Sequence, residues 1–319
     1  MPKVLIADKL SPAAVAIFKE RGVETDVKTG LPKEELIKIV GDYDGIAIRS
    51  ATKLTADVIK AAKKLKVIGR AGIGVDNVDI PAATAAGVIV MNTPFGNSIT
   101  TAEHAISLML ALARDLPAAN ASTQAGKWEK NRFMGVEITG KVLGLIGAGN
   151  IGSIVADRAR GLKMRVVAYD PFLSAERAQE LGVEKVELDD LLARADFITL
   201  HVPMTPETKN ILSADAIAKT KKGVRIINCA RGGLIDEAAL KAALDNGHVA
   251  GAALDVFETE PLPADSPLWD LDNVVLTPHC SYRSPLTMTR ALEQFKTNLA
   301  LYLKGEPLLH PLKDMALGY

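Results

Sequence analysis

Short apolar runs alternate with amphipathic stretches along most of this chain. Runs rich in Val, Ile and Leu, such as residues 4–7 and 45–48, are typical of buried strands. The stretches between them, such as residues 12–21 and 55–64, carry apolar residues at helical spacing. Strands that alternate with helices predict parallel sheets with helices on both faces.

The predicted elements fall into two series. The strands expected in the first series are residues 4–7, 23–27, 45–48, 67–69 and 88–91. Those of the second are residues 142–146, 165–169, 197–200, 225–228, 250–255 and 274–276. The sequence therefore predicts two α/β domains.

The segments outside the two series also have readable patterns. A Pro/Gly/Asn cluster at 92–97 predicts a loop, followed by a long apolar helix capped by Ser98 or Thr100. The polar segment 117–135 belongs to neither series, and we expect it to project as an arm that contacts another subunit. An amphipathic stretch at 285–304 predicts a final helix.

Composition narrows the class of protein. The 319 residues are 48% hydrophobic, which suits a folded chain, and 38 basic residues balance 38 acidic ones. A neutral chain is not expected to bind nucleic acid or acidic membranes. The longest apolar run, residues 105–113, is far short of the roughly 20 residues that cross a bilayer. We therefore expect a soluble, cytoplasmic protein.

The strongest motif is a glycine-rich turn between the predicted strand 142–146 and the helix after it. Gly147-Ala148-Gly149-Asn150-Ile151-Gly152 has the G-x-G-x-x-G spacing that lets a pyrophosphate approach a helix N-terminus. The next predicted strand ends at Asp170, whose carboxylate would accept the ribose hydroxyls of NAD and repel the 2′-phosphate of NADP. We therefore expect NAD as the cofactor.

A second Gly-x-Gly follows the predicted strand 67–69. Gly72-Ile73-Gly74 lacks the third glycine and the long helix of a dinucleotide site. It is expected to be either a plain turn or a nest of backbone N–H groups that holds a small anion.

Candidate catalytic residues follow three predicted strands of the second series. Arg231 suits a carboxylate of the substrate, His279 suits a hydroxyl proton, and Glu260 suits the task of orienting the imidazole. His201 ends another strand, where it would touch the cofactor. His104, inside the apolar helix, is expected to be a packed helix residue.

The two cysteines, Cys229 and Cys280, flank Arg231 and His279 in sequence. Neighbouring positive charge lowers a thiol pKa, so we expect both to be reactive thiols whose alkylation slows the reaction. Their spacing fits neither a disulfide framework nor a metal motif, so no metal is expected.

These motifs together resemble the NAD-dependent D-2-hydroxyacid dehydrogenases over the whole chain. The resemblance implies an α/β protein of two doubly wound parallel sheets, with a Rossmann NAD domain (residues 97–283) inserted into a flavodoxin-like substrate domain (residues 1–96 and 284–319). It assigns the substrate carboxylate to Arg231 and the acid–base pair to Glu260 and His279. It also implies a homodimer or homotetramer formed through the NAD domain and the 117–135 arm.

The same resemblance implies contacts to the cofactor and the substrate. Those to NAD would come from Gly147, Gly149, Asn150, Ile151, Gly152, Asp170, His201, Val202, Pro203, Thr208, Cys229, Ala230 and Asp255. Those to the substrate would come from Arg49, Ser50, Arg70, Gly72, Ile73, Gly74 and Asn97.

Within the family, residues 49–53, 69–77 and 91–97 look most like the short D-3-phosphoglycerate dehydrogenases, whose product is 3-phosphohydroxypyruvate in serine biosynthesis. Residues 280–284, Tyr282 included, look more like glyoxylate or hydroxypyruvate reductases and the NAD-sensing corepressor branch. The sequence therefore leaves three alternatives open, namely a phosphoglycerate dehydrogenase, a glyoxylate or hydroxypyruvate reductase, and an NAD-sensing protein. The chain ends at Tyr319, so no regulatory domain is expected after it.

Overall fold

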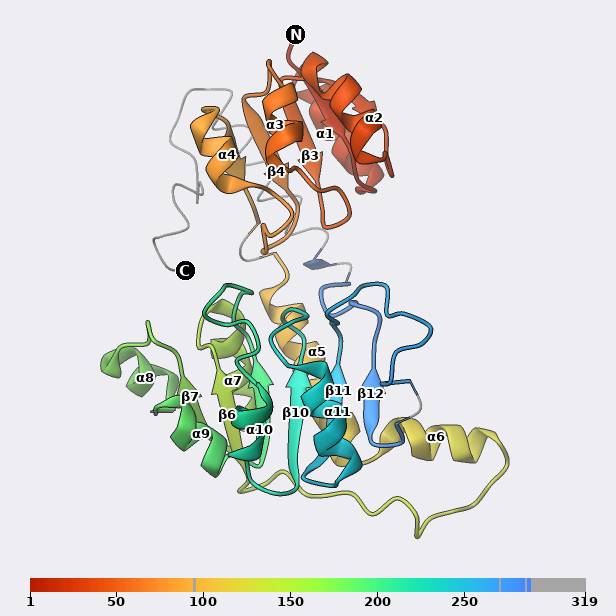
Figure 1. Cartoon of the computed structure of the whole chain (residues 1–319), viewed down its shortest axis with the longest axis vertical. Helices are drawn as coiled ribbons and strands as arrows, with labels where there is room; N and C mark the ends of the chain where they lie inside the picture. The colour runs from red at the N-terminus through yellow and green to blue at the C-terminus, as the bar shows by residue number, and fades with distance from the viewer. Residues whose placement is uncertain (94–95, 270, 285, 288–319) are drawn as a thin grey trace. The chain divides into compact units, whose positions relative to one another are not determined.

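The computed structural model describes residues 1–93, 96–269, 271–284 and 286–287, which form two compact units (Figure 1). Unit 1 comprises residues 1–97 with the described residues from Arg283 onward, and unit 2 comprises Ser98–Tyr282. The helix expected at 285–304 lies outside the described residues except for Leu286 and Thr287.

Unit 1 is built on a five-stranded parallel sheet with the order β2-β1-β3-β4-β5. Its strands are β1 (Lys3–Ile6), β2 (Glu24–Val27), β3 (Gly45–Ile48), β4 (Val67–Arg70) and β5 (Ile89–Met91). Its helices are α1 (Pro12–Glu20), α2 (Lys33–Ile39), the 3₁₀ turn η1 (Val40–Asp42), α3 (Ala56–Ala61) and α4 (Ile80–Ala85). This order is the flavodoxin-like one, so the expected fold of this part is confirmed.

Unit 2 is built on a seven-stranded parallel sheet with the order β12-β11-β10-β9-β6-β7-β8. Its strands are β6 (Val142–Ile146), β7 (Arg165–Tyr169), β8 (Glu184–Lys185), β9 (Phe197–Leu200), β10 (Val224–Asn228), β11 (Val249–Leu254) and β12 (Val274–Leu276). Chain order reverses between β6 and β9, as in a Rossmann sheet. Ligands bind such sheets beyond the carboxyl ends of the strands at this reversal.

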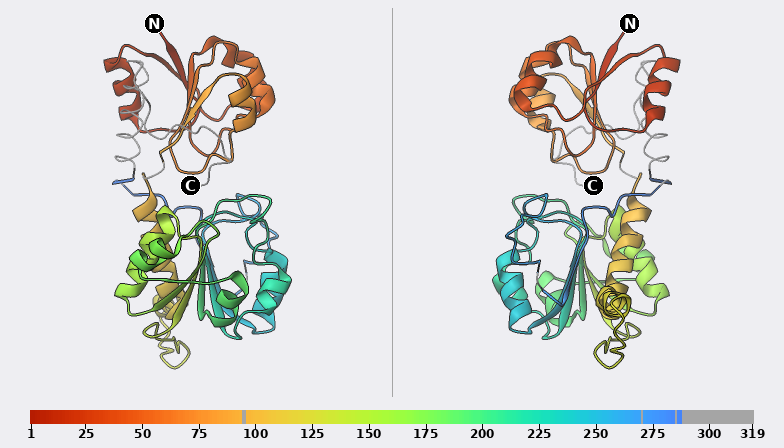
Figure 2. Two further views of the ribbon diagram at one scale, coloured as in Figure 1. Left: turned by 90° about the vertical axis from the view of Figure 1, so that its left-hand side faces the viewer. Right: turned by 90° about the vertical axis from the view of Figure 1, so that its right-hand side faces the viewer.

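Helices cover both faces of the unit 2 sheet (Figure 2). They are α5 (Ser98–Ala113), α7 (Asn150–Gly161), α8 (Ala175–Leu181), α9 (Leu188–Arg194), α10 (Ala214–Ala218) and α11 (Glu237–Asp245), while α6 (Leu116–Gln124) projects away from the sheet (Figure 1). One core layer joins Leu112 of α5 and Val155 of α7, and the other joins Leu191 of α9 and Leu240 of α11. Because both faces are covered, every residue of β6 is buried.

Three details differ from the sequence predictions. Helix α5 begins at Ser98, so Thr100 lies inside its first turn and the capping role expected there is wrong. Helix α6 occupies the first part of the 117–135 segment, for which no helix was predicted. The two-residue strand β8 is too short to leave a hydrophobic pattern.

Among the described residues, the helices are all too short or too polar to cross a lipid bilayer.

Close packing of α9 on β6 gives a test of the unit 2 core. A Cβ at Gly144 would lie 2.6 Å from Leu191 Cδ2 and 2.9 Å from Ala195 Cβ. We expect Gly144→Ala to destabilise the protein by about 1–3 kcal/mol, because overpacking displaces neighbours. Urea unfolding followed by far-ultraviolet circular dichroism measures the loss.

Gly161, at the end of α7, is the matched control. A Cβ there has no heavy atom within 4 Å. Gly161→Ala should therefore raise stability by up to about 1 kcal/mol, since Ala favours helix over Gly. Equal effects of the two substitutions would contradict the packing argument.

Candidate active site

The glycine-rich turn lies where β6 leads into α7, at the strand-order reversal. A Cβ at Gly152 would lie 2.0 Å from the carbonyl oxygen of Gly147, so only glycine lets the helix approach the turn this closely. A Cβ at Gly149 would have nothing within 4 Å, so the turn is open on that side. Asn150 and Ile151 begin α7 behind it, and their free N–H groups suit an anionic pyrophosphate.

Asp170 follows β7 and contacts the glycine-rich turn directly. Its Oδ2 accepts a hydrogen bond from Ala148 N at 2.8 Å, and its Oδ1 accepts one from Phe172 N at 2.9 Å. A carboxylate accepts about four hydrogen bonds, so both oxygens retain capacity for ribose hydroxyls. Turn, helix and carboxylate therefore suit a dinucleotide without a 2′-phosphate.

Beyond β9, the chain continues along the same sheet edge. His201 N donates to Ile146 O at 2.7 Å, which ties the end of β9 to the start of the glycine-rich turn. Burial lowers the pKa of the His201 ring to about 3, so this imidazole is neutral at physiological pH. Val202 and Pro203 follow, and Thr208 Oγ1 donates to Pro203 O at 2.7 Å.

Arg231 lies in a tight turn after β10, beyond Cys229 and Ala230. Asn228 shapes the turn, because its Nδ2 donates to Arg231 O at 2.8 Å and its Oδ1 accepts from Ala230 N at 3.0 Å. A Cβ at Gly232 would lie 1.8 Å from Phe257 O. Glycine therefore lets the loop after β10 pack directly on the loop after β11, which carries Glu260.

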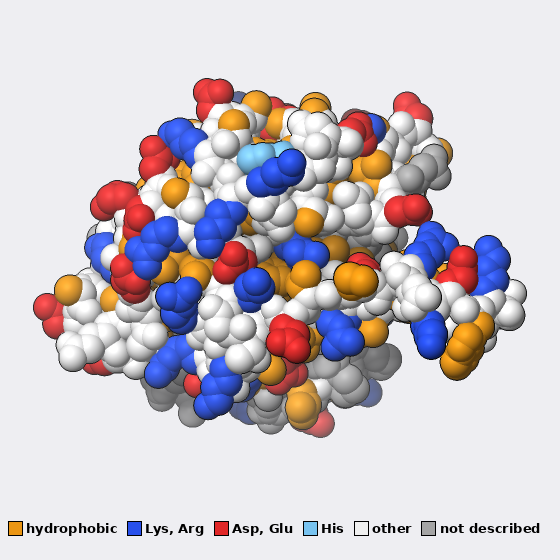
Figure 3. All heavy atoms as spheres, turned by 90° about the horizontal axis from the view of Figure 1, so that it is seen from below, with side chains coloured by type: hydrophobic (Ala, Val, Ile, Leu, Met, Phe, Trp, Pro, Cys, Tyr) orange, Lys and Arg blue, Asp and Glu red, His pale blue; other side chains and the backbone are white. Residues whose placement is uncertain are grey.

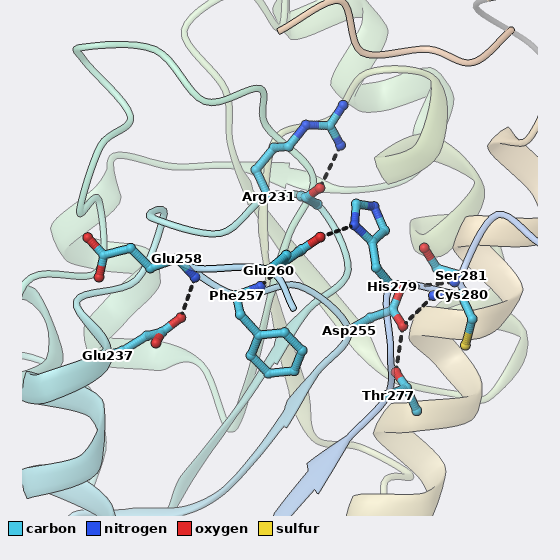
Figure 4. A network of polar contacts seen from close by, with 11 residues as sticks. Arg231, Glu237, Asp255, Phe257, Glu258, Glu260, Thr277, His279, Cys280 and Ser281 are labelled. Carbon is cyan, nitrogen blue, oxygen red and sulfur yellow. Dashed lines mark hydrogen bonds and ion pairs between the residues drawn. The ribbon is translucent and has the colours of Figure 1, made fainter. Parts of the chain in front are cut away.

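Glu260 and His279 form a hydrogen-bonded pair. Glu260 Oε2 lies 2.7 Å from His279 Nδ1, while Glu260 Oε1 accepts from Phe257 N at 3.1 Å. Burial acts to raise the pKa of Glu260, but the hydrogen bond and charge of His279 outweigh it and lower that pKa. In Figure 4, Glu260 points at the imidazole, and the side chains of Arg231 and His279 project to the same end of the site. With Nδ1 engaged, Nε2 is the ring atom left to meet a substrate.

The carboxylate of Asp255 holds the segment that carries His279. Asp255 is completely buried, and its Oδ1 accepts hydrogen bonds from Thr277 Oγ1 at 2.6 Å and Cys280 N at 2.9 Å. Its Oδ2 accepts from Ser281 N at 2.9 Å. Burial alone would raise the pKa of Asp255, but hydrogen bonds from His104, Thr277 and the two backbone N–H groups outweigh it and lower that pKa. Asp255 is therefore an anion with its partners in place.

The expectation that both cysteines have lowered pKa values is wrong. Burial raises the pKa of Cys229 well above its usual range, and the charge of Asp255 raises it further. Burial and the same carboxylate also raise the pKa of Cys280. Adjacency in sequence to Arg231 and His279 pointed to positive surroundings, but burial and the negative charge of Asp255 raise the pKa of both thiols.

The loop after β3 in unit 1 is held by a buried carboxylate as well. Asp8, two residues after the end of β1, accepts hydrogen bonds from Arg49 N at 2.6 Å and Thr52 Oγ1 at 2.7 Å. Asn77 Nδ2 donates to the carbonyl oxygens of Arg49 and Thr52, both at 2.6 Å. Arg49 and Ser50 therefore sit on a braced turn at the carboxyl edge of the five-stranded sheet.

The other expected substrate residues belong to neighbouring loops of unit 1. Arg70 ends β4, and its Nη1 lies 1.6 Å from where a Cβ of Gly72 would be, so the guanidinium occupies the space that this glycine leaves. Ile73 O accepts from Asn92 Nδ2 at 2.7 Å, which ties the 72–74 turn to the end of β5. The buried Oδ1 of Asn97 has no partner among the described residues.

Sequence reasoning missed Asp8, Asn77, Thr277 and the contact of His104. A signal existed for Asp8, since an acidic residue directly after an apolar strand needs buried partners. No such signal existed for His104, because its contacts come from residues far away in the sequence. Its Nε2 lies 3.3 Å from Thr277 Oγ1 and 3.5 Å from Asp255 Oδ1.

Known proteins resemble this chain in sequence. Residues 106–281 match the family model described as D-isomer specific 2-hydroxyacid dehydrogenase, NAD binding domain. The D-3-phosphoglycerate dehydrogenase of Archaeoglobus fulgidus is 54% identical over 277 residues, which are 87% of this chain and 53% of that protein. The enzyme of that name from Synechocystis is 52% identical over 318 residues, 100% of this chain and 55% of that protein. This chain thus spans about half the length of these relatives.

Solved structures match the whole chain. The TT0316 protein of Thermus thermophilus has a TM-score of 0.90 and 37% identity, covering 97% of this chain and 99% of that one. A glyoxylate reductase from Paecilomyes thermophila has a TM-score of 0.90 and 31% identity, covering 98% of each. Both coverage and identity place this chain in the family of D-isomer specific 2-hydroxyacid dehydrogenases.

Proposed function

We propose that this chain oxidises D-3-phosphoglycerate to 3-phosphohydroxypyruvate with NAD. The observation that carries the dehydrogenase chemistry is the 2.7 Å contact between His279 Nδ1 and Glu260 Oε2, in the same unit as the glycine-rich turn. The choice of substrate is supported by the identity of 52–54% to D-3-phosphoglycerate dehydrogenases and by the arginines of unit 1. An NAD-sensing protein without catalysis would not need this acid–base pair.

The proposed mechanism divides the work between three side chains. Arg231 pairs with the substrate carboxylate in a bidentate fork, which sets the orientation of C2 and its hydroxyl. His279 Nε2 takes the hydroxyl proton, and Glu260 stabilises the imidazolium that forms. When bound, NAD supplies the nicotinamide ring that accepts the hydride from C2.

The glycine-rich turn and Asp170 form the proposed binding site for NAD. The pyrophosphate would meet the N-terminus of α7, and the ribose hydroxyls would meet the carboxylate of Asp170. The expected contacts of Val202, Pro203, Thr208 and Ala230 belong to this proposal, because these residues follow strands at the same sheet edge.

A glyoxylate or hydroxypyruvate reductase is the second candidate. The ring of Tyr282 packs edge-on against His279, with centroids 5.7 Å apart and planes at 80°. An aromatic ring beside the acid–base histidine limits the room for a long substrate. The likeness to a glyoxylate reductase favours the same candidate.

We further propose that the 117–135 arm, which includes most of α6, contacts a second copy of the chain. Trp128 and Met134 on this arm are 85% and 86% exposed, which is unusual for such apolar side chains. Figure 3 shows the arm projecting at the right of the view, with basic side chains beside apolar ones.

A spectrophotometric panel tests the substrate. Wild-type protein should form NADH with D-3-phosphoglycerate faster than it consumes NADH with glyoxylate or hydroxypyruvate. Arg49→Ala should raise KM for D-3-phosphoglycerate by about one to two powers of ten, because a charge-assisted contact contributes roughly 1.5–3 kcal/mol. KM for glyoxylate should change much less.

Lys60→Ala removes an exposed positive charge from α3 and is the matched control, with KM expected unchanged. A preference of the wild-type protein for glyoxylate would make the second candidate correct. An equal rise in KM for both substrates would assign Arg49 to the fold instead.

His279→Ala tests the acid–base role. We expect kcat to fall by about 10²–10⁴, because the lost proton transfer belongs to the transition state. The affinity for NAD, measured by calorimetry, should stay the same.

His248→Gln is the control histidine, since its Nε2 contacts only Thr220 Oγ1 and Ile217 O among the described residues. Turnover that survives in His279→Ala would remove this histidine from the mechanism.

Asp170 should set the choice between NAD and NADP. We expect wild-type kcat/KM to favour NAD by about tenfold or more, equal to about 1.4 kcal/mol. Asp170→Asn should narrow that ratio, because it removes the charge and keeps an acceptor for Ala148 N. Equal use of both cofactors by the wild-type protein would show that this carboxylate does not face the ribose.

A further inference from the structure

Three metal-ligating side chains converge behind the acid–base pair. His104 comes from α5, Asp255 from the end of β11, and Cys280 from the segment after β12. One imidazole nitrogen, one carboxylate oxygen and the thiol sulfur all lie within 4.8 Å of one another. All three residues belong to unit 2, and neither His104 nor Cys280 has a part in the mechanism above.

We propose that His104, Asp255 and Cys280 form a binding site for a thiophilic divalent cation of the Zn²⁺ class. Imidazole, thiolate and carboxylate are the side chains that bind Zn²⁺, and three of them with one open position make a usual ligand set. Bonds of about 2.0–2.1 Å at a tetrahedral ion place a nitrogen and an oxygen ligand about 3.4 Å apart. His104 Nε2 and Asp255 Oδ1 lie 3.5 Å apart.

The site has capacity for an ion at each of its ligands. Asp255 accepts three hydrogen bonds, from Thr277 Oγ1 and the backbone N–H groups of Cys280 and Ser281. A carboxylate has about four acceptor positions, and the fourth meets His104 Nε2 at 3.5 Å, which is the contact that an ion would replace. The side chain of His104 is 22% exposed and Cys280 is partly buried, so an ion can reach both from solvent. Figure 4 shows the sulfur of Cys280 pointing toward α5, the helix that carries His104.

The charges of the cluster favour a cation. Asp255 is anionic and buried, while its charge and the burial of Cys280 keep the thiol protonated. When the ion binds, the S–H bond breaks, the sulfur–metal bond forms, and the proton goes to solvent. The ion then offsets the negative charge that otherwise opposes the thiolate.

Binding should also affect turnover, an effect that rests on the proposed function. Asp255 holds residues on both sides of His279, and Cys280 is the next residue in the chain, so an ion that joins Asp255 to Cys280 constrains this histidine. Zn²⁺ is therefore expected to inhibit the reaction, and a chelator to reverse the inhibition.

Cadmium is the probe, because its bond to a thiolate absorbs in the near ultraviolet. The 319-residue chain, without cofactor or substrate, should bind one equivalent of Cd²⁺ with such a band. The chain has only two cysteines, so Cys280→Ser should remove the band, and Cys229→Ser, at the buried cysteine, should keep it. His104→Gln should keep the band but weaken Cd²⁺ binding by about 10–100-fold or more, because loss of a mere outer-shell partner of a ligand already costs that much.

Each of three outcomes would overturn the proposal: a band that survives in Cys280→Ser, an affinity unaltered by His104→Gln, or no binding by the wild-type protein at micromolar Cd²⁺. Circular dichroism shows whether each variant keeps the wild-type fold. The titration needs no substrate, so it tests the metal site even if the protein shows no dehydrogenase activity. If Zn²⁺ still inhibits Cys280→Ser, the inhibition comes from an ion bound at another site.

Discussion

The buried carboxylate of Asp255 is the constraint on which the rest of the candidate active site depends. His279 adopts a left-handed backbone conformation with φ 47°, which costs a non-glycine residue about 1–3 kcal/mol. Asp255 accepts hydrogen bonds from Thr277, Cys280 and Ser281, on both sides of that residue. Each charge-assisted bond contributes about 1.5–3 kcal/mol, so together they outweigh the strain. The imidazole therefore reaches Glu260 from a backbone position that the chain would not adopt unaided.

Unit 1 uses the same arrangement for a different loop. Asp8 lies two residues after β1 and Asp255 lies one residue after β11, and each carboxylate accepts hydrogen bonds from backbone N–H groups of a loop from a neighbouring strand. In both units a buried carboxylate lies at the edge of the sheet, and its acceptor positions are occupied by hydrogen bonds. Each carboxylate orders a loop that bears candidate site residues. The cost of burying the charge is offset only because these donors are in place before any ligand arrives.

The sequence predicted local features well and long-range polar contacts poorly. β3, β6, β7, β9 and β12 begin and end at the predicted residues, because buried strands leave continuous apolar runs between turn residues. The glycine-rich turn with Asp170 was readable because its spacing is local. The pKa of Cys280 was predicted in the wrong direction, since neither its burial nor the charge of Asp255, the two main causes of the rise, can be read from its neighbours in sequence. The contact of His104 with Thr277 joins elements that no local pattern connects.

Under the proposed function, the division into two units separates chemistry from substrate choice. In that proposal Arg231, Glu260 and His279 meet the carboxylate, hydroxyl and C2 that every 2-hydroxy acid shares, so they would not distinguish one such acid from another. Discrimination must come from groups that meet the rest of the substrate, and the loops of Arg49 and Arg70 are braced within unit 1 by contacts independent of the acid–base pair. Because Asp8 and Asp255 order their loops separately, side chains on one loop can change without disturbing the other. One family can therefore keep a single hydride-transfer site while its members act on different acids.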